Sequence, residues 1–260
     1  MNKIDEIINL NDNPLNSDNF RVQCKKTLDE TGALVMKDFL CADAVDSIKA
    51  NGAEQQHLAY FTSTTHNIYL TQSDYSFPSD HVYNRQVNSS KGCITTDQIP
   101  DQSVLHALYK AQEFKEFLCA VLGEKSLHEY ADPLSGINLH YASEGQELGW
   151  HYDNSSFAIT LLIEKAKAGG VFEYVRDVRD ADQGEMNFDQ SSKVLDGDIK
   201  PKTLSMEPGT LVLFRGRNSM HRVTPTEGDT TRMLVVLAYN TEPNISLSES
   251  ARMTFFGRLE

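Results

Sequence analysis

The sequence is poor in cysteine, and the few that it has lie far apart. No two of them have the CxxC spacing of a zinc ligand pair, and they form no obvious disulfide framework. We therefore expect reduced thiols and a cytoplasmic location. The four cysteines are Cys24, Cys41, Cys93 and Cys119.

Basic residues are also scarce. The chain has 24 Lys and Arg against 37 Asp and Glu, which gives a formal net charge of −13. Proteins bind the phosphates of nucleic acids through clustered Lys and Arg, and no such cluster is present here. This balance predicts that the partner is not a nucleic acid.

Long apolar runs are absent as well. No stretch approaches the roughly 20 apolar residues that a membrane-spanning helix needs. The segment Met1–Leu10 carries acidic residues, unlike a signal peptide. We expect no membrane partner, and the oligomeric state stays open.

What the chain does have is enough apolar sequence for one sizeable core. It is 260 residues long and 40% hydrophobic, without internal repeats or a low-complexity linker, which predicts a single domain over residues 1–260. Residues 1–130 are expected to be mainly helical, with polar residues 61–100 as a lid over the site. The expected helices cover residues 18–28, 42–60 and 101–122.

The second half reads as a series of short strands separated by Gly and Pro. Apolar runs of strand length, with no helix between most of them, favour a closed or double-sheet β architecture. We predict a β-rich α+β fold with a double-stranded β-helix (jelly-roll) core over about 131–245, buttressed by the N-terminal helices. The expected strands cover residues 135–141, 157–163, 171–175, 210–214 and 232–239.

One motif in this half predicts a metal centre. His151 and Asp153 are separated by a single residue, so on a strand both side chains point to the same side. Together with the downstream His221 they form the two-histidine, one-carboxylate set that binds non-haem Fe(II). The alternative is structural: His151 as a core histidine and Asp153 as a turn residue.

The order of the motifs resembles that of a known family. The motifs are HYD at residues 151–153, GGVFEY at 169–174, EPGTLVLFRG at 207–216, HRVTP at 221–225, and Arg232 eleven residues after His221. This order resembles the Fe(II)/2-oxoglutarate-dependent oxygenases. It is most similar to the small bacterial amino-acid halogenases and hydroxylases related to BesD and HalD.

The resemblance implies a set of cofactors and their ligands. Fe(II) would be bound by the predicted triad, and Arg232 would hold the distal carboxylate of 2-oxoglutarate. Tyr141 and Thr160 are further candidates for binding 2-oxoglutarate, although Tyr141 could equally be a core aromatic. O₂ is the other co-substrate, and succinate and CO₂ are the expected by-products.

One departure from the resemblance decides between two reactions. The halogenases of this subgroup carry glycine in place of the metal-binding carboxylate, which leaves a coordination position for chloride. This chain keeps Asp153, which would fill that position. The resemblance therefore implies an enzyme that hydroxylates an unactivated C–H, with a small free amino acid or related amine as substrate.

The candidates for substrate binding rest on position alone. Each has a structural alternative as a turn former, a solvated loop residue or a strand terminator. They are His81, Arg85, Asn154, Glu173, Asn240 and Thr241.

Four other functions are alternatives. A halogenase or a desaturase of the same family would use the same cofactors. A cupin-like, non-catalytic metal-binding protein would have HxH and a downstream Glu as ligands, which this chain lacks, and would have no use for Arg232. Nucleic-acid demethylases of related fold carry Asn-x-Tyr, whereas Asn138 and Tyr141 are one residue too far apart.

Overall fold

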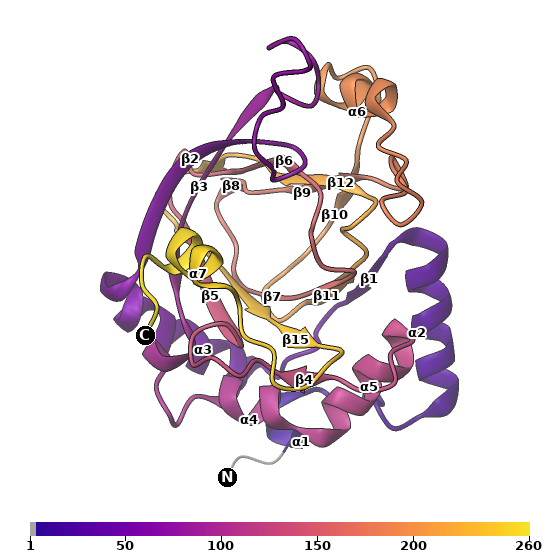
Figure 1. The fold of residues 1–260 in the computed structure, drawn as a ribbon. Coiled ribbons are helices and arrows are strands. Elements are labelled where there is room, and N and C mark those ends of the chain that lie inside the picture. The colour runs from indigo at the N-terminus through magenta and orange to yellow at the C-terminus, as the bar shows by residue number, and fades with distance from the viewer. Residues whose placement is uncertain (1–3) are drawn as a thin grey trace.

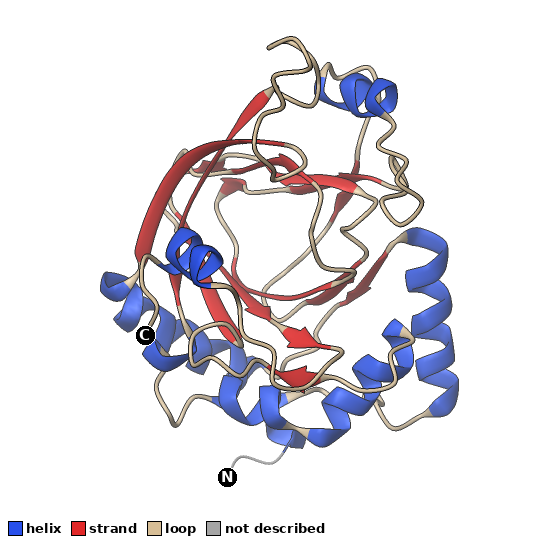
Figure 2. Ribbon diagram, in the orientation of Figure 1, coloured by secondary structure: helices blue, strands red, loops and turns tan. Residues whose placement is uncertain are grey.

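The computed structural model describes residues 4–260, so the first three residues of the segment Met1–Leu10 lie outside it. The helices of residues 4–122 line one side of a strongly curved sheet, as Figures 1 and 2 show. No helix of the described chain is long and apolar enough to cross a bilayer. The helices are α1 (Ile4–Ile7), α2 (Asp18–Thr31), α3 (Ala42–Gln55), α4 (Val104–Lys110), α5 (Gln112–Leu122), α6 (Phe188–Leu195) and α7 (Glu249–Phe256).

Within residues 4–260, eleven strands form one sheet that curls into a nearly closed roll, and two small two-stranded sheets flank it. The strands are β1 (Ala33–Met36), β2 (Tyr60–Asn67), β3 (Gln86–Ile94), β4 (His128–Glu129), β5 (Ile137–Ala142), β6 (Leu148–His151), β7 (Ala158–Glu164), β8 (Ala168–Gly169), β9 (Phe172–Val175), β10 (Lys202–Leu204), β11 (Leu211–Phe214), β12 (Met220–Val223), β13 (Thr226–Glu227), β14 (Arg232–Leu237) and β15 (Tyr239–Asn240).

The strand order gives the roll two walls. One wall has the order β1-β11-β7-β14-β5, and the other has the order β6-β12-β9-β10. Strand β3 pairs with both β5 and β6 and so joins the walls. This is a jelly-roll, or double-stranded β-helix, core with N-terminal helices on its outside, and the predicted fold class is confirmed.

Alternation along the strands separates an outer core from the interior of the roll. On β14, Met233, Val235 and Leu237 point outward into the largest hydrophobic cluster, which also contains residues of α2 to α5. Their neighbours Arg232, Leu234 and Val236 therefore face the interior. A second cluster, with Leu162 of β7 and Phe214 of β11, lies on that inner side.

The N-terminal part differs from its prediction in two places. Residues 61–100 were expected to form a lid, but β2 and β3 pair over eight consecutive positions of a long hairpin. The expected helix over residues 101–122 is broken at Ala111, whose backbone is extended between α4 and α5. Strands β2 and β3 thus lie in the part predicted to be mainly helical, and the single-domain assignment stays a prediction.

Helix α2 follows the sequence closely. Ser17 caps its first turn by accepting a hydrogen bond from the Phe20 N–H, and Gly32 ends it with a left-handed φ of 76°. Strand β1 starts at the next residue and pairs with β11 at the edge of the sheet. Helix α2 is thereby fixed beside the roll.

Candidate active site

The HxD motif lies at the end of β6. His151 is the last residue of that strand and points into the roll, whereas Trp150 and Tyr152 pack into a cluster on the other face. Asp153 follows in the loop, where its N–H donates to the Gly216 carbonyl over 3.1 Å. His221 lies on β12, directly opposite His151 in the strand pairing.

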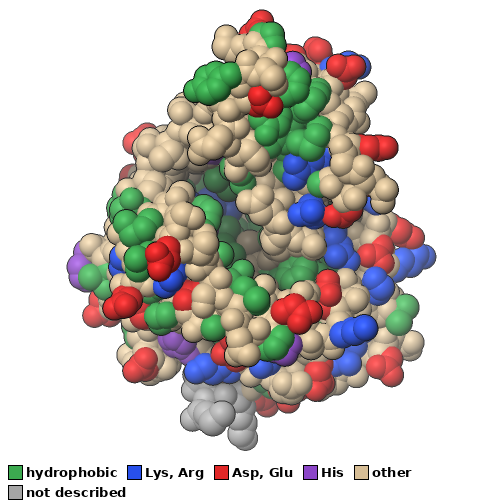
Figure 3. Space-filling view, viewed as in Figure 1, with side chains coloured by type: hydrophobic (Ala, Val, Ile, Leu, Met, Phe, Trp, Pro, Cys, Tyr) green, Lys and Arg blue, Asp and Glu red, His purple; other side chains and the backbone are tan. Residues whose placement is uncertain are grey.

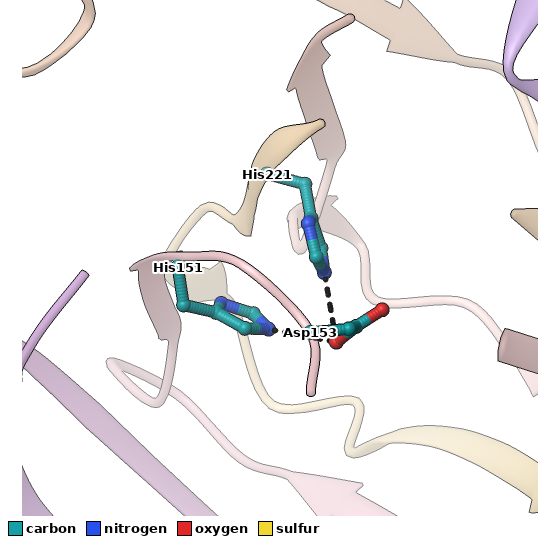
Figure 4. Close-up of side chains that lie close together, drawn as sticks. All are labelled: His151, Asp153 and His221. Atoms are coloured by element: carbon teal, nitrogen blue, oxygen red, sulfur yellow. Dashed lines mark ion pairs between the residues drawn. The ribbon is translucent and has the colours of Figure 1, made fainter. Parts of the chain in front are cut away.

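The three predicted metal ligands converge in space. One ligand atom from each of His151, Asp153 and His221 lies within 4.8 Å of the others. The Asp153 Oδ1 atom is 3.6 Å from His151 Nε2 and 3.4 Å from His221 Nε2. Figure 4 shows both imidazoles directed toward this carboxylate from two different strands.

Backbone carbonyls orient both imidazoles. His151 Nδ1 lies 2.8 Å from the Gly149 carbonyl, and His221 Nδ1 lies 2.9 Å from the Ser219 carbonyl. Because a carbonyl only accepts, each Nδ1 carries a proton, and Nε2 is the ring nitrogen directed at the carboxylate. Such a hydrogen bond to the second ring nitrogen is the usual support of a metal-binding histidine.

The charges of the site favour a bound cation. Burial opposes ionisation of Asp153, but the adjacent His221 and His151 outweigh it and hold the pKa of Asp153 well below its usual range. Burial and the neighbouring His221 lower the pKa of His151, so its imidazole is neutral near pH 7. A neutral imidazole at His151 and an ionised carboxylate at Asp153 are protonation states that metal ligation requires.

One oxygen of Asp153 has no partner in the described chain. Its Oδ2 atom is buried and makes no hydrogen bond. A buried carboxylate oxygen without a donor is costly, and a metal ion at this point would remove that cost. The donor set therefore fits a divalent cation such as Fe(II), held on one face by three protein ligands.

Gly216 makes room for this carboxylate. A Cβ at residue 216 would lie 1.8 Å from Asp153 Oδ2 and 2.5 Å from Asp153 Cγ. Any side chain at residue 216 would push Asp153 away from the two histidines. The glycine of the RGR sequence at 215–217 is thus part of the site.

Arg232 opens β14 and points into the roll. Its side chain is only 6% exposed, and within residues 4–260 it forms no ion pair. Burial lowers the pKa of Arg232 to about 10, so the guanidinium remains charged at pH 7. A buried, unpaired guanidinium is suited to bind an anion that enters the roll.

The two other candidates for 2-oxoglutarate binding lie on opposite faces of the sheet. Thr160 is half-buried on β7 and pairs with Val212 and Val236, which face the interior. Tyr141 faces outward, and its hydroxyl donates to the Gly52 carbonyl of α3 over 2.7 Å. The position of Tyr141 does not support its predicted role, because β5 turns this residue toward the helices.

The six substrate candidates are not brought together. Asn154 follows Asp153, and its carbonyl accepts a hydrogen bond from Arg217. Arg85 forms an ion pair with Asp196 over 2.7 Å. His81 stacks on Phe77 in an aromatic cluster with α6, away from the triad.

The remaining candidates face elsewhere. Glu173 forms an ion pair with Arg222 over 2.7 Å on the outer face of the roll, where Arg222 also covers the Trp150 ring. Asn240 belongs to β15, which pairs with β4 in a separate small sheet, and Thr241 follows it. Of the six candidates, only Asn154 is next to a residue of the triad in the sequence.

The sequence analysis missed three polar residues near the site. His66 of β2 lies with its ring centroid 6.3 Å from that of His151, and its Nε2 is 2.6 Å from Ser89 Oγ. Lys91 of β3 and His140 of β5 face the interior beside Arg232. Strict alternation on β5, with Ile, Leu and Tyr outward, could have indicated His140.

A cleft of about 300 Å³ lies on the other side of Gly216, between α2 and the loops after β9 and β11. Its arginines are already paired with acidic residues: Arg217 with Asp182 over 2.9 Å, and Arg215 with Asp29 over 3.5 Å. This cleft therefore has fewer unpaired charged side chains than the interior of the roll.

Comparison with known proteins identifies the family. Residues 16–254 match the model of the halogenase D (HalD) family. No curated protein sequence matches the chain significantly.

Several solved structures share the fold. A 2OG-Fe(II) oxygenase family oxidoreductase from Burkholderia pseudomallei is 13% identical, with 87% of this chain and 93% of that chain covered, at a TM-score of 0.55. The non-haem α-ketoglutarate-dependent carbocyclase SnoK of nogalamycin biosynthesis is 11% identical, with 84% and 82% covered, at a TM-score of 0.58. A Pseudomonas putida prolyl-4-hydroxylase is 12% identical, with 83% and 96% covered, at a TM-score of 0.50.

The family match, the roll and the convergent His-Asp-His set agree with one another. The chain belongs to the halogenase D family and has the fold and the metal-ligand set of an Fe(II)/2-oxoglutarate-dependent oxygenase.

Proposed function

We propose that this enzyme is a hydroxylase that uses Fe(II), 2-oxoglutarate and O₂ to hydroxylate an unactivated C–H of a small free amino acid or related amine. When bound, these groups supply the oxidising power, and 2-oxoglutarate is converted to succinate and CO₂. The protein holds the reactants in place and keeps water away from them.

The observation that carries this proposal is the place of the Asp153 carboxylate. Its Oδ1 lies 3.4 and 3.6 Å from the two Nε2 atoms, so it occupies the third protein ligand position. A family member that transfers chloride needs that position for the halide. With Asp153 there, hydroxylation is favoured over halogenation.

Each interior residue has a distinct part in the proposal. His151 and His221 would present their Nε2 lone pairs to iron, with Asp153 as the anionic ligand. Arg232 would bind the distal carboxylate of 2-oxoglutarate by a charge-assisted pair. Thr160, which faces the same interior, would be a second contact for 2-oxoglutarate.

The test is a product analysis in the presence of chloride. The enzyme would be incubated with Fe(II), 2-oxoglutarate, O₂ and chloride, together with a panel of free amino acids. We expect succinate and a product that has gained one oxygen atom. A product with the chlorine isotope pattern would establish the halogenase alternative, and one that has lost two hydrogens would establish the desaturase.

A metal-binding protein without catalysis is separated by a simpler observation. Anaerobic addition of Fe(II) and 2-oxoglutarate should give the weak visible charge-transfer band of the chelate. A folded protein that binds iron without this band would be cupin-like.

For the location of the enzyme we keep the cytoplasm as a proposal. The four cysteines, which are free thiols, support it.

A further inference from the structure

A second buried cation lies inside the roll. The Lys91 Nζ atom is 3.3 Å from Nδ1 and 3.4 Å from Nε2 of His140, so the ammonium contacts the imidazole on the neighbouring strand. In the described part of the chain Lys91 has no carboxylate partner. A lysine ammonium has three donors, and His140 can accept only one of them.

Both side chains line a space that solvent can reach. Burial lowers the pKa of Lys91, and burial together with Lys91 holds the pKa of His140 well below that of a free imidazole. Even so, both residues keep intermediate exposure. Figure 3 shows the face of the roll hollowed at its centre, with Lys or Arg side chains visible in its depth.

Lys91 and Arg232 flank one small residue. Gly92 pairs with Tyr141, and Ala142 pairs with Arg232, so Lys91 comes opposite Ala142 in the same row. The two cations thus stand two strand spacings apart, about 10 Å between Cα atoms. The small side chain of Ala142 lies between them in this row.

Strand β3 also brings Lys91 toward the strand of the metal ligands. Cys93 and Asp153 are the charged groups that act on Lys91, and Lys91 and Arg232 are those that act on His140. Ser89, two residues before Lys91 on the same face of β3, accepts a hydrogen bond from the N–H of Gly149 on β6. Lys91 therefore stands between the strand that carries His151 and the position of Arg232.

The charges of the proposed complex leave Lys91 without a counter-ion. Asp153 and the two carboxylates of 2-oxoglutarate supply three negative charges, and Fe(II) with Arg232 supplies three positive charges. Among the described side chains that face the interior of the roll, the ammonium of Lys91 is the cation left over. A partly buried charge of this kind is unfavourable until an anion pairs with it.

We infer that Lys91, supported by His140, binds a carboxylate of the substrate, at a site separate from the one that Arg232 provides for 2-oxoglutarate. This inference rests on the proposed function. It narrows the proposed substrates to those that carry a carboxylate, and so excludes amines without one. The acid group would anchor the substrate beside the triad, so that the carbon to be hydroxylated lies at a fixed distance from the anchor. Lys91 is thus a specificity-determining residue.

The experiment uses the anaerobic Fe(II)·2-oxoglutarate chelate and its visible band. The proteins are the wild type, Lys91→Met, Lys91→Arg, and Lys26→Met as a control at an exposed position of α2. Each is titrated first with 2-oxoglutarate, to obtain its affinity. The loaded protein is then titrated with free amino acids and with the corresponding amino-acid amides, and the shift of the band reports binding.

We expect the wild type to bind at least one acid about ten- to a hundredfold more tightly than its amide, the worth of one charge-assisted hydrogen bond. Lys91→Met should lose this discrimination and keep its affinity for 2-oxoglutarate. Lys91→Arg should retain part of the discrimination, and Lys26→Met should behave as the wild type.

Several results would overturn the inference. A loss of 2-oxoglutarate affinity of about tenfold in Lys91→Met would assign the lysine to the co-substrate instead. Equal binding of acid and amide by the wild type, or no response to any acid while the chelate forms, would remove the carboxylate site. Failure of the wild type to form the chelate at all would refute the proposed function itself.

Discussion

His151 and His221 are direct partners across β6 and β12, with their ring centroids 4.1 Å apart. The distance between two metal ligands is therefore set by the pairing of two strands that are far apart in the sequence. A metal ion bound by both histidines would tie these strands together. Metal binding and the stability of the roll should be linked.

This link gives the first prediction. A divalent ion that binds the folded state alone should stabilise it by about 2.7 kcal/mol at a hundredfold excess over its dissociation constant. Differential scanning fluorimetry with Mn(II) or Co(II) under anaerobic conditions would measure the shift. Asp153→Ala should lose the shift together with hydroxylation, because it removes one ligand.

Asp182→Ala is a suitable control for that variant. Asp182 pairs with Arg217 near the same loop, but it is outside the triad. The control should retain the metal-dependent shift. A full shift or full activity in Asp153→Ala would remove this carboxylate from the ligands.

Replacement of Arg232 by leucine should separate 2-oxoglutarate from iron. Loss of the guanidinium deletes a charged pair and no metal ligand, so the requirement for 2-oxoglutarate should rise about a hundredfold with little change for Fe(II). The Arg232→Leu protein without co-substrate should melt at the same or a higher temperature, since the guanidinium is buried and unpaired. Chelate titrations, with Lys26→Leu as the control at an exposed position, would measure both affinities. Equal losses would contradict the role.

Gly216→Ala tests the space beside the carboxylate. The added methyl would lie within 1.8 Å of Asp153 Oδ2, so Asp153 must move away from the histidines. We expect metal affinity to fall about ten- to a hundredfold, as when the support of a ligand is lost. Gly197→Ala meets no atom within 4 Å and should leave the affinity unchanged.

The stability of the metal-free protein should decrease below about pH 6.5. Burial, Lys91 and Arg232 keep the pKa of His140 well below this value in the folded state. Below this pH His140 is protonated in the unfolded chain but not in the folded chain. Proton binding therefore stabilises the unfolded state. By pH 5.5 this one group should cost about 1 kcal/mol.

Denaturant unfolding between pH 7.5 and 5.5 would measure this effect. His140→Gln should show a shallower decrease with falling pH than the wild type. His57→Gln, at an exposed position, controls for the loss of a histidine as such. An identical slope in the wild type and in His140→Gln would show that His140 does not contribute.

The sequence predicted the site better than it predicted its surroundings. The spacing of His151 and Asp153 indicated a common direction because strand alternation is local, and their approach to His221 followed from the jelly-roll fold. The β2–β3 hairpin was missed because Thr62 to Thr65 and Ser89 to Ser90 are polar on both faces. Such strands carry no apolar period.

Residue orientation was the other source of error. Tyr141 and His140 are adjacent on β5, and a one-residue difference decides which of them enters the roll. A spacing of ten residues from His151 pointed to Tyr141, but the turn between β5 and β6 sets the register. Glu173 on β9 points outward for the same reason, because the register of its strand decides which face it takes.

The close approach of Gly216 to Asp153 has a consequence for how such enzymes diverge. A chain that exchanges Asp153 for glycine no longer needs the space at residue 216, so larger residues become acceptable there. A chain that regains the carboxylate must first recover a glycine at residue 216. Across the family the two positions should therefore vary together. The residue at 216 should indicate whether an enzyme descends from one that carries the carboxylate at 153.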